Sequence, residues 1–223
     1  GADYYPRLTE VIHDKVAAVR LMNDQAQLGL AIGGPVLLLL IGLAPWVITL
    51  LYSSAFEPAV TLLQWQMVGN VFKLASWAMS FSIVAAARGK TFFLMELSFN
   101  IVFLGMVFMF LPQVGLDVTA YAFVLGYLVY LTIVYVLARS IHGFRWQALS
   151  LGLLGLHTGL AVALLVLALM APLAAAIASP LLAAATGLFG LRVVLSKVGK
   201  HGRLPTRLYG IFERLGWPVQ SAV

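Results

Sequence analysis

Long apolar runs separated by short polar breaks make up most of the chain from residue 28 onwards. A bilayer core about 30 Å thick needs about 20 apolar residues per helix, and six of the runs are long enough to cross it. The predicted spans are residues 28–52, 58–86, 92–111, 118–138, 149–172 and 174–195. Glycine, proline and polar residues fill the connections, as expected for turns. The pattern therefore predicts an all-α integral membrane protein with about six transmembrane helices.

The two flanking segments have a different pattern. Over residues 6–24, apolar positions recur at helical spacing among charged ones, which predicts an amphipathic helix along the membrane surface. The tail, residues 199–223, is similar but is broken by glycine and proline, so surface anchoring and no particular role both stay open. In the first span, Pro35 and Pro45 each remove a backbone hydrogen bond. Either the helix bends there or neighbouring helices absorb the kink.

Basic residues alternate with the spans. Thirteen of the fourteen lysines and arginines lie before the first span, between the second and third, between the fourth and fifth, or at and after the end of the sixth. The intervening turns at 53–57, 112–117 and 171–180 contain none. The positive-inside rule then predicts that both ends of the chain face the cytoplasm. The net charge of +6 reports topology and contact with anionic lipid headgroups, so we expect no nucleic-acid partner.

Composition narrows the function further. Hydrophobic residues make up 62% of the chain and charged residues 10%, against about 45–50% and about 25% in soluble proteins. Cysteine is absent, which excludes disulfides and thiolate metal sites. The sequence shows no loop long enough for a soluble catalytic domain, no acidic pair at metal-ligand spacing, no glycine-rich phosphate loop and no nucleophile elbow. We therefore expect passage of a substrate rather than an enzymatic reaction, without a metal or other cofactor.

The fourteenth basic residue, Lys73, lies deep in the second predicted span, about 22 Å from its cytoplasmic end. A charge at the centre of a span costs at least about 2.5–3.5 kcal/mol, so a wet cavity or a partner is expected. The same helical stripe carries Gln66, Asn70, Trp77 and Ser80. An ammonium group pairs with phosphate, amides bond hydroxyls and an indole stacks on a sugar. The alternative is a structural stripe, with Lys73 paired to an acid elsewhere in the protein.

The third predicted span carries Glu96 and Asn100 four residues apart on one face. Glu96 lies near the cytoplasmic edge of the span, so its depth argues against direct pairing with Lys73. It is either a protonatable coupling group or a partner for Arg88 or Lys90.

Two further groups are interpreted as structural. His157, in the fifth span, is expected to be a hydrogen-bonded packing residue rather than a titrating site. Packing and interface belts account for the tyrosine series of the fourth span, which comprises Tyr121, Tyr127, Tyr130 and Tyr135.

Several segments of the chain form a familiar set: GADYYPRLTE, NDQAQL, APWVITLLYSSAFEPAVTLLQWQMVGNVFKLASW and AAARGKTFFLMELSFN. Together they resemble bacterial polysaccharide exporters of the O-antigen flippase type, which belong to the multidrug/oligosaccharidyl-lipid/polysaccharide exporter superfamily. The DYYPRL and LYSSAF elements are the more specific ones. The resemblance covers residues 1–140 well, whereas the last two spans match in hydropathy alone.

The resemblance implies an architecture of two six-helix lobes around a central cavity, followed by two extra helices. Residues 1–26 would be the end of a preceding helix and a cytoplasmic amphipathic connector, and residues 27–140 four helices of the C-terminal lobe. Residues 141–198 would be the two extra helices, and residues 199–223 a cytoplasmic tail. Because the chain starts with Gly1 rather than methionine, we expect the native protein to continue upstream.

The resemblance also implies a function: flipping of undecaprenyl-pyrophosphate-linked oligosaccharide, such as O-antigen units, across the bacterial cytoplasmic (inner) membrane by alternating access. Lys73 would neutralise the pyrophosphate or acidic sugars, and Gln66, Asn70 and Trp77 would contact the glycan. The implied partners are the lipid-linked oligosaccharide, membrane lipids and other membrane proteins of polysaccharide assembly.

Three alternatives stay open. A drug/cation antiporter of the same superfamily would favour acidic cavity residues. A membrane glycan polymerase or ligase would act on the same lipid-linked sugars, and a scaffold of a glycan-synthesis complex would transport nothing.

Overall fold

The computed structural model describes residues 4–52, 54–199, 203–214 and 216–219, and within them it is built from helices without a strand. The all-α fold expected from the sequence is confirmed. Two short helices stand near the ends, α1 (Tyr4–Val11) and α8 (Arg203–Arg214), and a 3-10 turn covers Ser54–Phe56. The long helices are α2 (Lys15–Leu51), α3 (Ala59–Ala85), α4 (Gly89–Val114), α5 (Asp117–His142), α6 (Ala148–Met170) and α7 (Pro172–Val198).

Helices α2 to α7 are each long and apolar enough to cross a membrane, so the six predicted spans are confirmed. The chain is a multi-pass membrane protein. The largest difference in bounds is at the first span, because α2 begins at Lys15 rather than near residue 28. Helix α2 also continues through Pro35 and Pro45, with Pro35 buried beside Gly187 of α7.

The single amphipathic helix expected over residues 6–24 is wrong. Helix α1 ends at Val11, and α2 begins at Lys15 after a three-residue gap, with Asp14 as its N-cap. The Asp14 carboxylate accepts the backbone N–H groups of Val16 at 2.9 Å and Ala17 at 3.1 Å, which stabilises a new helix start. The apolar face of α1 is buried in the protein, since the Tyr4 hydroxyl donates to a carbonyl of α3 at 2.6 Å. This segment therefore belongs to the bundle.

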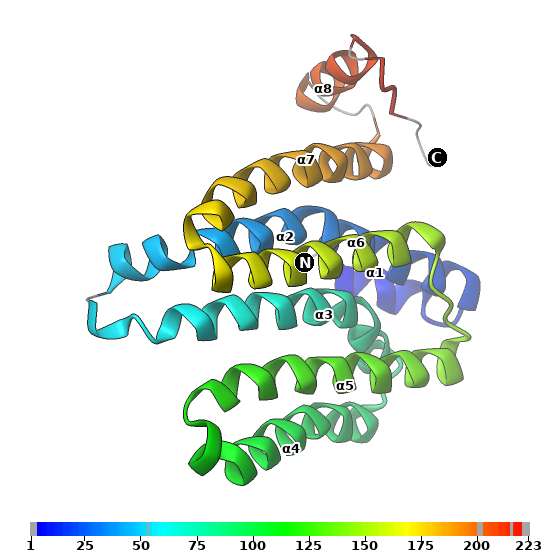
Figure 1. Ribbon diagram of the computed structural model, residues 1–223. Helices are drawn as coiled ribbons and strands as arrows, with labels where there is room; N and C mark the ends of the chain where they lie inside the picture. The colour runs from blue at the N-terminus through cyan, green and yellow to red at the C-terminus, as the bar shows by residue number, and fades with distance from the viewer. Residues whose placement is uncertain (1–3, 53, 200–202, 215, 220–223) are drawn as a thin grey trace.

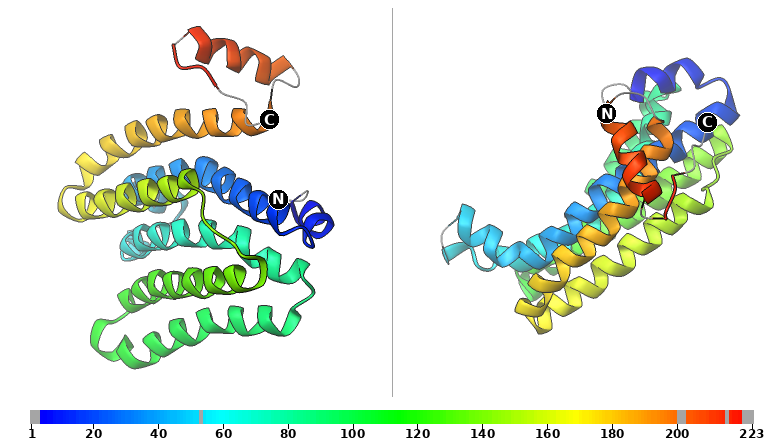
Figure 2. Two further views of the ribbon diagram at one scale, coloured as in Figure 1. Left: turned by 90° about the vertical axis from the view of Figure 1, so that its right-hand side faces the viewer. Right: turned by 90° about the horizontal axis from the view of Figure 1, so that it is seen from above.

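Figure 1 and the left view of Figure 2 show the order α7, α2, α3, α5, α4 across the bundle, with α6 packed beside α2 and α3. The turns α2–α3, α4–α5 and α6–α7 gather at one end (Figure 1). The other end holds α1, the α3–α4 and α5–α6 connections and the last turn of α7. We call it the basic end because its described residues include Arg7, Lys15, Arg20, Arg88, Lys90, Arg139, Arg145 and Lys197.

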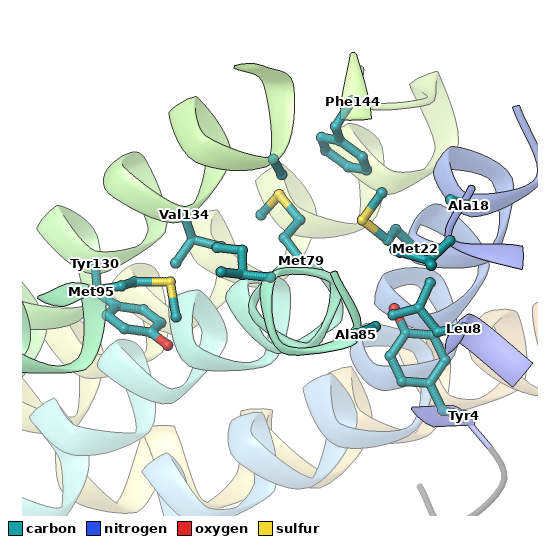
Figure 3. Close-up of a cluster of buried hydrophobic side chains, with 13 residues drawn as sticks. Tyr4, Leu8, Ala18, Met22, Met79, Ala85, Met95, Tyr130, Val134 and Phe144 are labelled. Carbon is teal, nitrogen blue, oxygen red and sulfur yellow. The ribbon is translucent and has the colours of Figure 1, made fainter. Parts of the chain in front are cut away.

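Two groups of buried apolar residues hold the long helices together. The first lies towards the basic end, where Met79 of α3, Val134 of α5 and Phe144 of the α5–α6 connection meet the side chains of α1 and α2 (Figure 3). The second joins the middle of α2 to α3 and α6 and includes Leu38, Ile41, Val71, Leu153 and Leu164. Helix α4 contributes little to either group, because Met95 is the residue that it buries.

Close backbone approach replaces large side chains where α7 meets α2. A Cβ atom added to Gly190 would lie 2.1 Å from the Ala31 carbonyl oxygen. A Cβ added to Gly42 would lie 2.1 Å from the Ser179 hydroxyl. Small residues at such contacts let helices pack closely in a membrane, where the hydrophobic effect does not drive helices together.

A buried polar network fixes α2 against the start of α6. Asn23 is fully buried, and its Oδ1 atom accepts from the Gln147 backbone N–H at 2.9 Å and from the Ser150 hydroxyl at 2.8 Å. Its Nδ2 atom donates to the Arg145 carbonyl at 3.0 Å. Gln27, one turn further along α2, donates to the Ser150 hydroxyl at 2.9 Å. The network therefore sets the position of α6 relative to α2.

Candidate functional site

Lys73 lies near the middle of α3, twelve residues before the helix ends at Ala85, or about 18 Å along its axis. Its side chain is half-buried, and its Nζ atom lies 5.3 Å from the centroid of the Tyr127 ring on α5. An ammonium group over an aromatic face is attracted by the ring quadrupole. Among the described residues, no carboxylate lies within ion-pair distance of Lys73. The contact observed for the Lys73 ammonium group is thus with an aromatic ring rather than with an acid.

A cavity of about 350 Å³ opens beside Lys73, between α3, α4 and α5. Helix α3 lines it with Lys73, Trp77, Ser80 and Phe81, helix α4 with Phe92, Glu96 and Phe99, and helix α5 with Tyr127 and Tyr130. We call it the Lys73 cavity. It lies where α3 packs against α4 and α5, and one of its lining residues, Tyr130, belongs to the first group of buried apolar residues.

Glu96 shares this cavity with Lys73. The buried Tyr130 hydroxyl donates a hydrogen bond to the Glu96 carboxylate. Neither Arg88 nor Lys90 lies within ion-pair distance of Glu96 in the described chain, so its observed partner is the tyrosine. The expectation that depth would keep Glu96 from pairing directly with Lys73 agrees with the structure, although both side chains border one cavity.

The other polar residues expected at the site lie outside the cavity lining. Asn70 uses its Nδ2 atom to donate to the Gln66 carbonyl of its own helix at 2.9 Å. Gln66 stands seven residues before Lys73, about 10 Å along α3, and does not line the cavity. Asn100 is exposed and donates to the Glu96 carbonyl at 3.0 Å. The predicted stripe lies on one face of α3, but only three of its residues line the cavity: Lys73, Trp77 and Ser80.

The sequence assigned the tyrosines of α5 to packing and interface belts rather than to a binding site. Tyr127 does pack, with ring centroids 4.5 Å from Phe99 and 4.8 Å from Phe123. Together with Tyr130 it also forms the α5 wall of the cavity. Their spacing of three residues puts both on one face, but the apolar sequence of α5 does not reveal which face meets Lys73.

The chemistry of the Lys73 cavity combines one ammonium group, one carboxylate, two phenols and aromatic walls. Trp77 lines the cavity and is 52% exposed. Such a set can pair with an anionic group and stack on a flat or apolar face of its carrier. No group of three or more histidine, aspartate or glutamate side chains suited to a metal ion occurs among the described residues.

His157 has the packing role expected from the sequence. It is buried in α6, with its Nδ1 atom 2.9 Å from the Leu153 carbonyl. Its ring fills the space left by Gly34 of α2, where an added Cβ atom would lie 2.2 Å from His157 Cδ2. His157 therefore lies in the helix interface, apart from the Lys73 cavity.

Comparison with known proteins adds no family or relative to the evidence from the cavity. No protein-family model, curated protein or solved structure matches the chain. The resemblance of its segments to polysaccharide exporters stays an expectation, which the geometry of the Lys73 cavity can support as a proposal.

Proposed function

We propose that the chain is the C-terminal part of a flippase that moves an anionic lipid-linked oligosaccharide across the bacterial cytoplasmic membrane. The observation that carries this proposal is the Lys73 ammonium group, which borders a cavity in mid-span and, among the described residues, has no carboxylate within ion-pair distance. Holding an unpaired charge at this depth costs at least about 2.5–3.5 kcal/mol. A pyrophosphate or acidic sugar that enters the cavity would offset this cost by charge pairing.

The size of the cavity limits what it holds. About 350 Å³ is at the lower end of the range for ligand pockets, about 300–1,000 Å³. The Lys73 cavity would therefore take the charged group and a neighbouring sugar, with Trp77 stacked on that sugar. The rest of the glycan and the lipid chain would lie outside it.

The charge of the connecting segments indicates which end of the bundle faces the cytoplasm. Short connections rich in lysine and arginine face the cytoplasm in most membrane proteins, so the basic end would be the cytoplasmic end.

The Glu96–Tyr130 hydrogen bond lies between α4 and α5 at the cavity wall. Protonation of Glu96 would weaken this bond, which gives the site a means of coupling to a proton gradient.

One observation favours a second candidate, an exporter of organic cations. Glu96 places a carboxylate on a cavity whose walls are largely aromatic, and both features attract cations. In that case Glu96 would bind the substrate, and Lys73 would act as a competing internal cation that the substrate displaces.

The test is complementation of cells that lack their O-antigen-type flippase. Full-length protein would be compared with its Lys73→Gln and Lys73→Arg variants at matched membrane levels, while surface polysaccharide and lipid-linked precursor are measured together. We expect loss of export with precursor accumulation for Lys73→Gln, and partial export for Lys73→Arg, which keeps the charge. Lys90→Gln is the matched control, because Lys90 is an exposed lysine at the basic end of α4.

Two results would count against this proposal. Full export by Lys73→Gln would keep the flippase function but would remove the lysine, on which the proposal rests, from the transport step. Resistance to organic cations that is lost in Glu96→Gln and kept in Lys73→Gln, with no glycan export, would favour the cation exporter.

A further inference from the structure

A second cavity, of about 570 Å³, lies at the basic end, where the start of α2 faces the α5–α6 connection. Three basic side chains line it: Lys15, Arg20 and Arg145. Its lining also includes the apolar side chains of Val16 and Val19 and contains no acidic residue. His142, which is only 4% exposed, borders the cavity from the bundle side. We call this the α2–α5 cavity.

The α2–α5 cavity differs from a neighbouring cavity in the charge of its lining residues. A cavity of about 480 Å³ on the other side of α2 also has basic lining residues, but Glu10 and Asp24 line it too. The Asp24 carboxylate is paired there with Lys197 of α7. The α2–α5 cavity has no acidic residue in its lining, so an anion that enters it faces Lys15 and Arg145 without a competing carboxylate there.

The depth of the α2–α5 cavity identifies the source of the anion. Helix α5 ends at His142 and α6 begins at Ala148, so the cavity lies where two membrane spans leave the bundle. This is the level of lipid headgroups for helices of this length. Val16 is 81% exposed beside Lys15, which places apolar and basic side chains together at the rim.

We propose that the α2–α5 cavity binds the headgroup phosphate of an anionic phospholipid, with Lys15 and Arg145 pairing with the phosphate and Val16 and Val19 contacting the acyl chain. Basic pockets between membrane helices are suited to such headgroups. A soluble phosphate compound would use the same charges but would gain nothing from the valines. The site is independent of the Lys73 cavity and of any glycan substrate.

The test measures lipid binding to full-length protein in detergent by native mass spectrometry. Dioleoyl phosphatidylglycerol and dioleoyl phosphatidylcholine are titrated against the wild type and the Lys15→Gln/Arg145→Gln double variant. We expect about 25-fold weaker phosphatidylglycerol binding in the double variant, because each basic residue contributes roughly fivefold near an anionic lipid. Arg139→Gln is the matched control, since Arg139 is exposed at the basic end and bonds Tyr135 outside the cavity.

The substitutions spare the fold, because Lys15 and Arg145 are exposed and the Arg145 backbone carbonyl still accepts the Asn23 bond. The single Arg145→Gln variant should bind phosphatidylglycerol roughly fivefold more weakly, which gives a second measurement. Equal binding of both lipids by the wild type, or unchanged phosphatidylglycerol binding by the double variant, would overturn the proposal. Displacement of phosphatidylglycerol by glycerol 1-phosphate at equal concentration would also overturn it and assign the site to a soluble phosphate.

Discussion

The Asn23 network allows a quantitative prediction about how α6 is attached to the bundle. The Asn23→Ala variant loses three hydrogen bonds to the segment that leads into α6, namely those with Arg145, Gln147 and Ser150. A typical hydrogen bond contributes about 1 kcal/mol to stability, and bonds between membrane helices average about 0.6 kcal/mol. The expected loss is therefore about 2–3 kcal/mol of unfolding free energy.

Reversible unfolding of the purified protein by SDS in mixed micelles would measure this loss. Ser150→Ala removes one of the three bonds and also the bond from Gln27, so it is expected to cost about 1–2 kcal/mol. The double variant should cost less than the sum of the single variants, because both residues share that bond. Thr49→Ala is the control, since the Thr49 hydroxyl is exposed and bonds only its own helix at Pro45.

A loss below about 0.5 kcal/mol for Asn23→Ala would refute the reasoning. It would mean that the network is replaced at no cost when the asparagine is absent, and that apolar packing alone holds α6 in place. Additive losses in the double variant would show instead that the two side chains act independently.

Three further predictions concern packing, the cavity and topology. Gly190→Ala forces a Cβ atom against the α2 backbone and should destabilise the protein by about 1–3 kcal/mol in the same unfolding assay, whereas Gly159→Ala, which has nothing within 4 Å, should not. Tyr130→Phe removes the bond to Glu96 and should reduce export at matched protein levels, at a stability cost near 1 kcal/mol; unchanged export would exclude the bond from transport. Because the chain has no cysteine, a single Asp117→Cys should react with an impermeant maleimide in spheroplasts, while Arg145→Cys should react only after lysis; the reverse pattern would invert the topology.

Hydropathy predicted the six spans because lipid imposes a length and composition on each membrane helix whatever its neighbours are. The start of the first span was missed, since charged residues such as Lys15 and Arg20 mark the part of α2 that lies beyond the apolar run. The signal for that start was present in Asp14, which precedes a helical run as an N-cap residue does.

The candidate site was predicted only in part. The charge of Lys73 identified the region, because an ammonium group in mid-span needs a reason to be there. Which residues join it depends on the rotation and tilt of α4 and α5 against α3. Glu96 and Tyr127 reach the cavity from those helices, while Gln66 on α3 itself does not. Helices that are apolar on all sides carry little periodicity, so one sequence does not reveal these rotations.

The sparse burial of α4 has a consequence for how its sequence can change. Side chains such as Phe93 and Phe108, which are 65% and 82% exposed, have only to be apolar, so drift among leucine, valine, phenylalanine and methionine should be nearly neutral there. The selective constraint would fall on the narrow strip formed by Phe92, Met95, Glu96 and Phe99. In a saturation mutagenesis map, α4 would therefore show one intolerant stripe on an otherwise permissive helix.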